Sequence, residues 1–235
     1  IVGFNSIDII EQAKNKGLAR SIIDGVSSLF ELNEMLIILE DDIVVSKDFL
    51  DYMNEYLILY RNNENVASIH GYCYPIERLP ETFFIKGADC WGWATWRKYW
   101  YLFEKNPKKI LEALNKKKLT FSFDMNNQYS YSKMLRDNIV GKNDSWAVRW
   151  HASMFLKNYL TLYPQKSLVK NIGFDGSGEH CSFSTSYDTK IARNFNKVGK
   201  SIPIKESDEA KEKIIKFFKK ERRLINRIKN KILTI

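Results

Sequence analysis

The feature that most constrains this chain is a short apolar run that ends directly in three acidic residues. No polar side chain interrupts Met35 to Leu39, and Glu40, Asp41 and Asp42 follow at once. Five apolar residues are too few to cross a membrane and suit a strand that is buried on both faces. Because open α/β sheets bind ligands beyond the carboxyl ends of their strands, we expect this acidic triplet (Glu40, Asp41 and Asp42) to border a binding site.

The rest of the chain alternates between helical and strand-like patterns. Ser46 is the expected N-cap of the second helix, with Asp48 in its first turn. We expect helices over 18–30, 47–60, 93–104, 107–114, 146–157 and 208–232, and strands over 35–39, 66–69, 82–85, 159–163 and 169–172, with connections at 116–127 and 173–178. This order predicts the α/β class, with a Rossmann-like mixed, mainly parallel sheet flanked by helices.

Composition and charge set the domain organisation. The 235 residues are 44% hydrophobic, which favours one large domain over 1–205, followed by a basic amphipathic helix over 206–235. The net charge is +9, and the segment from Asp208 onward holds ten basic and four acidic residues. That tail could rest on an acidic membrane surface, or could pack on the domain with a solvated basic face.

The cysteines and the first residues of the chain indicate the cellular compartment in which the protein works. Cys73, Cys90 and Cys181 are three widely spaced cysteines without a CxxC pair, which predicts reduced thiols and no zinc site. The first residues lack the basic start and apolar stretch of a secretory signal. We therefore expect a cytoplasmic protein.

Three consecutive carboxylates repel one another unless a cation neutralises them. Mg²⁺ and Mn²⁺ prefer oxygen ligands and keep coordination positions open for phosphates, so the acidic triplet suggests a metal–diphosphate site. On the triplet alone, a solvated turn that caps the next helix is an equally good interpretation.

The order of the motifs resembles a known family. Leu18-Ala19-Arg20 opens a helix to Phe30, and Ile38-Leu39-Glu40-Asp41-Asp42 and Asp48-Phe49 follow. This order resembles the N-acetylglucosaminyltransferase I family of GT-A glycosyltransferases, and bacterial surface-polysaccharide sugar transferases. The resemblance spans about residues 14 to 181, and the opening strand–helix–strand unit of the family is expected to be truncated. It implies that Asp42 binds the metal and that Glu40 or Asp41 contacts sugar or ribose hydroxyls.

The Trp-rich stretch from Gly87 to Arg97 is the second candidate region. Asp89 could hold hydroxyls of the donor sugar, and the resemblance implies that Trp91 and Gly92 face the donor or the acceptor. For Trp96 and Trp100 we expect burial in the core.

Further candidates lie on either side. Asp144 precedes Trp146 and Arg149, a position that the resemblance assigns to the catalytic base, although Asp at such a place is often only an N-cap. His180 is the expected late histidine near the metal or phosphates, whereas His70 and His151 are expected to pack within a strand and a helix. Two cations, Lys16 and Arg20, could bind nucleotide phosphates or could be solvated helix-start charges.

Together these patterns predict a metal-dependent, inverting glycosyltransferase. It would use Mn²⁺ or Mg²⁺ and a nucleotide-diphosphate sugar, with UDP as the expected nucleotide, and extend a glycan or lipid-linked acceptor in surface polysaccharide synthesis. The alternative is a non-catalytic sugar- or nucleotide-binding module. Nucleic acid is not an expected partner, because acids and aromatics share the body while the excess charge lies in the tail.

Overall fold

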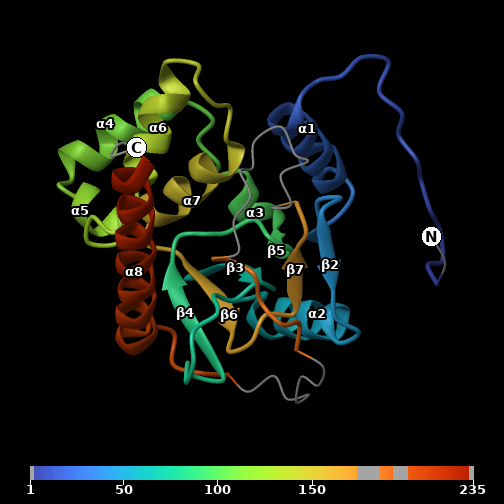
Figure 1. Ribbon diagram of the computed structural model, residues 1–235. Helices are drawn as coiled ribbons and strands as arrows, with labels where there is room; N and C mark the ends of the chain where they lie inside the picture. Colours follow the sequence, from blue (N-terminus) through green and yellow to red (C-terminus); the bar gives the residue numbers. More distant parts are fainter. Residues whose placement is uncertain (1–2, 174–185, 193–200, 233–235) are drawn as a thin grey trace.

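The computed structural model describes residues 3–173, 186–192 and 201–232, which form a mixed α/β structure (Figure 1). Residues 3–17 form no helix or strand and are exposed. The elements, in chain order, are α1 (Leu18–Phe30), β1 (Met35–Ile38), β2 (Ile43–Val45), α2 (Phe49–Tyr60), β3 (Val66–His70), β4 (Thr82–Lys86), β5 (Trp93–Trp96), α3 (Arg97–Trp100), α4 (Pro107–Lys116), α5 (Thr120–Phe123), α6 (Tyr131–Ile139), α7 (Trp146–Leu156), β6 (Leu160–Pro164), β7 (Val169–Asn171) and α8 (Asp208–Ile232).

Five strands form the central sheet in the order β1-β5-β3-β6-β4, and β2 pairs with β7 separately. The mixed sheet was predicted correctly, but its mainly parallel character was not: β3 and β6 pair in parallel, and the other three pairs of neighbours are antiparallel. Strands β1, β3 and β6 nevertheless run the same way, since β5 lies antiparallel between β1 and β3. Their carboxyl ends therefore share one edge of the sheet.

The register brings distant sequence segments together at that edge. Trp93, at the start of β5, lies opposite both Ile38 at the end of β1 and His70 at the end of β3. The acidic triplet after β1 and Gly92 before β5 consequently lie next to the segment that leaves β3. The Gly71 amide donates to the Gly92 carbonyl oxygen over 2.7 Å, which joins the last two segments.

The Trp-rich stretch was predicted as a helix from 93 to 104, and this was wrong. Residues 93–96 form the buried strand β5, and only the short helix α3 follows. Aromatic and β-branched side chains suit a strand packed on both faces, and Thr95 donates its hydroxyl to the Ala67 carbonyl of neighbouring β3. Burial of Trp96 and Trp100 agrees with the prediction.

Three smaller expectations also differ from the structure. β1 is an edge strand in which only Ile38 is fully buried, rather than a strand covered on both faces. Helix α2 begins at Phe49 with Asp48 in the N-cap position, so Ser46 is not the cap. Strand β2 and helices α5 and α6 had no clear sequence signal, because they are short or polar.

Helix α2 packs against β3 and β5, and α1 against β1. Helices α4 to α7 gather beside the sheet (Figure 1). They share an apolar cluster made of Ile110, Leu114, Phe123, Leu135, Val148, Ala152 and Phe155. Helix α8 packs along β4 through buried Ala210, Ile214 and Phe218, so its first half belongs to the folded body. Within the part of the chain that the structure describes, no helix combines the length and the apolar character that crossing a bilayer requires.

Candidate functional site

The acidic triplet occupies the turn between β1 and β2, at the sheet edge where the parallel-running strands end. Glu40 and Asp42 are half-buried, and Asp41 is exposed. The Ile43 amide donates to the Glu40 carbonyl oxygen and closes the turn, which keeps the three carboxylates close to one another. The prediction that these residues lie at the rim of the sheet is confirmed.

Glu40 carries the clearest electrostatic signal in the triplet. Burial and the charges of Asp42 and Asp41 raise the pKa of Glu40 from 4.5 to about 7, against a hydrogen bond from the Trp146 indole that lowers it. A carboxyl group with such a pKa is poised to change its charge when a cation arrives. The same hydrogen bond ties the triplet to the first turn of α7.

Asp42 is held by the second, smaller sheet. The side chain of Asn171 in β7 hydrogen-bonds the Asp42 carboxylate, while the Ile172 amide donates to the Asp42 carbonyl oxygen over 2.9 Å. Burial and the adjacent Asp41 charge raise the pKa of Asp42. Its Oδ1 atom is buried without a hydrogen-bond partner among the described residues. An orphaned carboxylate oxygen of this kind calls for an explanation, and a bound cation is one.

The chain approaches Asp42 closely at Gly173. A methyl group at this position would lie 2.5 Å from Asp42 Oδ2, so a larger residue here would have to displace the carboxylate. The expected loop and its Glu179, His180 and Cys181 begin just beyond, outside the residues that the structure describes. The predicted role of His180 therefore stays a prediction.

The residues present fit a cation only in part. Among the residues described, no group of three or more His, Cys, Asp or Glu side chains is arranged to hold a metal ion. Asp42, with its orphaned oxygen, and the neighbouring Asp41 would supply carboxylate oxygens. Mg²⁺ and Mn²⁺ sites of this type use one or two carboxylates and complete the coordination with substrate phosphates and water.

Asp144 lies in the loop before α7, and its carboxylate is 76% exposed. It is not the N-cap of that helix, because the Ser145 hydroxyl accepts the Val148 amide. Asp144 Oδ1 instead accepts from Arg149 Nη2 over 2.8 Å, and the same guanidinium donates to the Lys105 carbonyl oxygen. The nearly buried Arg149 thus fixes an accessible carboxylate two residues before Trp146.

The Trp-rich stretch contributes unequally to the site. Gly92 is buried with φ of +64°, and a methyl group there would meet Val169 Cγ1 at 2.8 Å, so packing by itself requires glycine. Trp91 is half-buried and packs edge-on against Tyr72, with ring centroids 4.7 Å apart. Asp89 accepts from the Tyr163 hydroxyl and from the Cys90 amide, both over 3.1 Å.

Six buried or half-buried tyrosines lie close enough to Asp89 to sense its charge, and the sequence analysis did not identify them. Burial raises the pKa of each, and the negative charge of Asp89 adds to the effect at every one: Tyr72, Tyr74, Tyr129, Tyr131, Tyr163 and Tyr187. They come from β6, α6 and three loops. Only the abundance of tyrosine, twelve in the chain, could have suggested such a cluster.

The two remaining histidines serve the framework. His151 in α7 packs against Tyr131 and Phe123, and its Nδ1 lies 2.7 Å from the Ala88 carbonyl oxygen. His70 in β3 is fully buried, and its Nδ1 lies 4.0 Å from Asp89 Oδ2. Both placements agree with the predicted packing roles.

Lys16 and Arg20 do not join the rim. Both pair with Asp24 on α1, at 3.6 and 3.4 Å. No ion pair within the described ranges connects either cation to the acidic triplet, which favours the reading of solvated helix-start charges.

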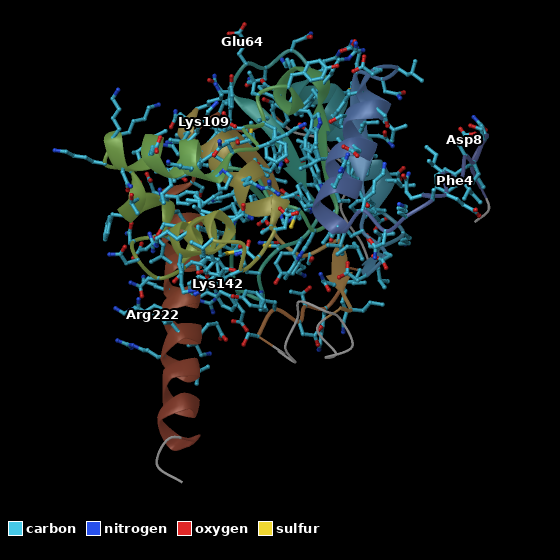
Figure 2. All side chains as sticks on the ribbon, turned by 90° about the horizontal axis from the view of Figure 1, so that it is seen from above. Phe4, Asp8, Glu64, Lys109, Lys142 and Arg222 are labelled. Atoms are coloured by element: carbon cyan, nitrogen blue, oxygen red, sulfur yellow. The ribbon has the colours of Figure 1, made fainter. Side chains whose placement is uncertain are left out.

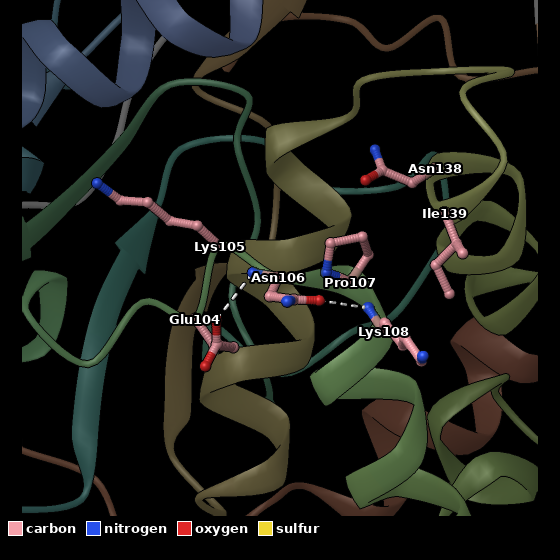
Figure 3. A pocket seen from close by; sticks show the side chains of 7 residues that line it. All are labelled: Glu104, Lys105, Asn106, Pro107, Lys108, Asn138 and Ile139. Atoms are coloured by element: carbon pink, nitrogen blue, oxygen red, sulfur yellow. Dashed lines mark hydrogen bonds between the residues drawn. The ribbon is translucent and has the colours of Figure 1, made fainter.

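A surface hollow of about 610 Å³ lies between residues 104–108 and the end of α6 (Figure 3). Asn138 and Ile139 line one side, and Asn106 caps α4 on the other. The hollow borders Lys105, whose carbonyl oxygen holds Arg149, so it adjoins the support of Asp144 rather than the acidic triplet.

The candidate site therefore consists of Glu40, Asp42, Asn171 and Trp146. Asp144 precedes Trp146 by two residues in the sequence. Asn171 and Trp146 were missed as site residues. Asn171 belongs to no motif, Trp146 was noted only as part of the pattern after Asp144, and both reach the triplet through tertiary contacts. No family model matches this chain, and no curated protein matches it.

Proposed function

We propose that this protein is a metal-dependent, inverting glycosyltransferase that moves a sugar from a nucleotide diphosphate to a glycan or lipid-linked acceptor. The observation that carries the proposal is the hydrogen bond between Trp146 and Glu40. It brings the acidic triplet, suited to a diphosphate with Mn²⁺ or Mg²⁺, to the helix that Asp144 precedes. UDP is the nucleotide that the family resemblance favours.

In this proposal the acidic triplet and Asp144 divide the work. A cation at Asp42 would neutralise the diphosphate that leaves. Asp144 would take the proton of the acceptor hydroxyl while that oxygen forms a bond to the anomeric carbon, and the bond from that carbon to the diphosphate oxygen would break on the opposite face. Arg149 orients the Asp144 carboxylate, and the exposure of that carboxylate leaves room for an acceptor.

The protein would work in the cytoplasm, in surface polysaccharide synthesis, with α8 on the inner face of the membrane. Support for the last point is the charge of the helix from Lys219 onward, where seven basic residues accompany one acid. Figure 2 shows α8 continuing past Arg222, beyond the rest of the described molecule.

The experiment is a thermal-shift titration with UDP in the presence of Mn²⁺ or EDTA. A ligand that binds only the folded state raises the melting temperature, so we expect a shift that requires the metal. Asp42→Ala should abolish the shift, whereas Glu112→Gln, a surface acid on α4, should keep it. A shift of equal size in EDTA, or in Asp42→Ala, would contradict the proposal. Binding without any transfer to acceptors would favour a non-catalytic binding module.

A further inference from the structure

The tyrosine cluster around Asp89 adjoins the acidic triplet and has a different chemistry. The Cys90 thiol senses the charges of Asp89, Glu40 and Asp42, which together with its burial raise the pKa of Cys90. Geometry also makes the two regions neighbours: Gly92 follows Asp89 by three residues, and a methyl group at Gly92 would lie 3.3 Å from Leu39 Cδ2, in the residue just before Glu40. A group bound at Asp89 would be next to a diphosphate bound at Asp42.

Within the described residues, Asp89 is a carboxylate without a cationic partner. His70 is the one basic side chain within 4.0 Å of it among the described residues, and burial lowers the pKa of His70, so the imidazole is neutral. The separation of 4.0 Å between His70 Nδ1 and Asp89 Oδ2 exceeds hydrogen-bond distance. Both ring nitrogens of His70, which is fully buried, lack a partner within the described part of the chain.

The donors that do reach Asp89 are neutral and leave it room for more. Tyr163 bonds one oxygen and the Cys90 amide the other, while an ionised carboxylate has about four acceptor positions. The side chain keeps 27% of its surface exposed. Hydroxyl or ammonium groups of a ligand can therefore reach it.

Aromatic rings pack on one another in the segments next to Asp89. Trp91 packs against Tyr72 and Tyr187, with centroids 4.7 and 6.1 Å apart, and Tyr74 contacts Tyr72 at 5.4 Å. Aromatic faces with a few polar groups suit a ring that carries both C–H and hydroxyl surfaces. The raised pKa values of the tyrosines keep their hydroxyls protonated and neutral.

We infer that the Asp89 cluster binds the pyranose ring of the donor sugar and selects neutral or amino sugars over sugars that carry a carboxylate. The inference rests on the proposed function, because it names the class of sugar that the transferase would carry. Like charges brought together at an interface cost several kcal/mol, so a uronate beside unneutralised Asp89 would be rejected. Hydroxyls of a neutral sugar, in contrast, would satisfy the free acceptor positions.

The test is ligand-observed saturation-transfer NMR on the full chain with two kinds of probe. One is a panel of methyl pyranosides of glucose, galactose, mannose and N-acetylglucosamine, and the other is methyl glucuronide. We expect wild-type protein to bind at least one neutral pyranoside roughly tenfold or more tightly than the glucuronide, as like-charge rejection requires. Asp89→Asn should lower the ratio of the affinity for the neutral pyranoside to the affinity for the glucuronide, and Glu112→Gln should leave this ratio unchanged.

Equal binding of glucuronide and neutral sugars, binding of none of them, or an unchanged ratio in Asp89→Asn would overturn the inference. The wild-type comparison needs no variant, so the test stands even if Asp89→Asn folds poorly. Titration of UDP with Mn²⁺ on the same sample separates the two proposals. Sugar selectivity without metal-dependent UDP binding refutes the transferase, whereas UDP binding without selectivity refutes only the assignment of Asp89.

Discussion

Two carboxylate sites lie at the same edge of the sheet, and they differ in how the neighbouring groups compensate their negative charge. The acidic triplet crowds three carboxylates in one turn, which raises the pKa of Glu40 and Asp42, and Asp42 Oδ1 has no hydrogen-bond partner among the described residues. Asp89 is a single carboxylate with hydrogen bonds from a tyrosine and a backbone amide. A cation would relieve the repulsion in the first environment, and the second can accept neutral hydroxyls.

The difference follows from the elements that build each site. The triplet sits beyond an edge strand, where half-buried carboxylates repel one another and Asn171 and Trp146 contribute the side-chain donors found among the described residues. Asp89 follows β4 inside a packed aromatic framework that fixes its surroundings. One sheet edge thus offers a half with three crowded carboxylates and a half with one carboxylate among neutral hydroxyls and rings, which matches the charged and uncharged parts of a sugar diphosphate.

The largest expected effect concerns Asp144, a third carboxylate that belongs to neither of the two sites compared above. Asp144→Asn keeps the shape of the side chain and removes the proton acceptor, so transfer should fall by ~10²–10⁴ while Mn²⁺-dependent UDP binding persists. Single-turnover transfer and the thermal shift measure the two effects. Transfer at the wild-type rate would remove Asp144 from the mechanism, and lost UDP binding would place it with the triplet.

A second prediction concerns the framework below Asp89. Gly87 has φ of +99°, and a methyl group there would lie 2.4 Å from the His151 ring. Gly87→Ala combines backbone strain with overpacking and should lower the free energy of unfolding by about 2–4 kcal/mol in urea titrations.

The matched control is Gly25→Ala in α1. No atom lies within 4 Å of a methyl group at this site, and alanine favours a helix by up to about 1 kcal/mol, so this variant should be slightly more stable than wild type. If both variants had the same stability, the rigid framework assigned to the Asp89 side would be incorrect.

The third prediction tests, by changing the pH, whether repulsion among the carboxylates of the acidic triplet lowers the stability of the protein. The pKa of Glu40 is about 7 in the folded protein and 4.5 as its ordinary value. The folded state therefore holds the proton more tightly, and stability from this group is lost as pH rises from about 4.5 through 7. Without metal, Glu40→Gln should be more stable than wild type by about 1–2 kcal/mol at pH 8, after allowance for partial exposure.

Urea titrations in EDTA at pH 5 and pH 8 measure this effect. The advantage of Glu40→Gln should shrink at pH 5, where wild-type Glu40 is protonated. An advantage that stays the same at both pH values would show that the carboxylates of the triplet do not repel one another as described.

The smallest expected effect concerns the basic residues of α8, which lie outside both carboxylate sites. Each basic residue near an anionic bilayer contributes about 1 kcal/mol, so Lys220→Gln should weaken flotation with vesicles containing anionic lipid by about fivefold. Lys109→Gln on α4 should leave binding unchanged. Wild-type protein that fails to float, or an equal loss in both variants, would refute the membrane contact.

Several parts of this structure follow from local sequence. Helices α1, α4, α7 and α8 were predicted within a few residues, because their apolar spacing and their ends are encoded locally. The position of the acidic triplet at the sheet rim was also predictable, since an apolar run that ends in charge marks the end of a strand. The triplet itself, as three adjacent acids, needs no folding to be recognised.

Tertiary structure alone decided how the site is assembled. β5 replaced a predicted helix because pairing with β1 and β3 outweighs the helical pattern of the Trp-rich stretch. Asn171 and Trp146 reach the triplet from positions more than one hundred residues away, and the tyrosines around Asp89 converge from separate elements. Chain direction and long-range packing set these encounters, and neither leaves a periodic signal in the sequence.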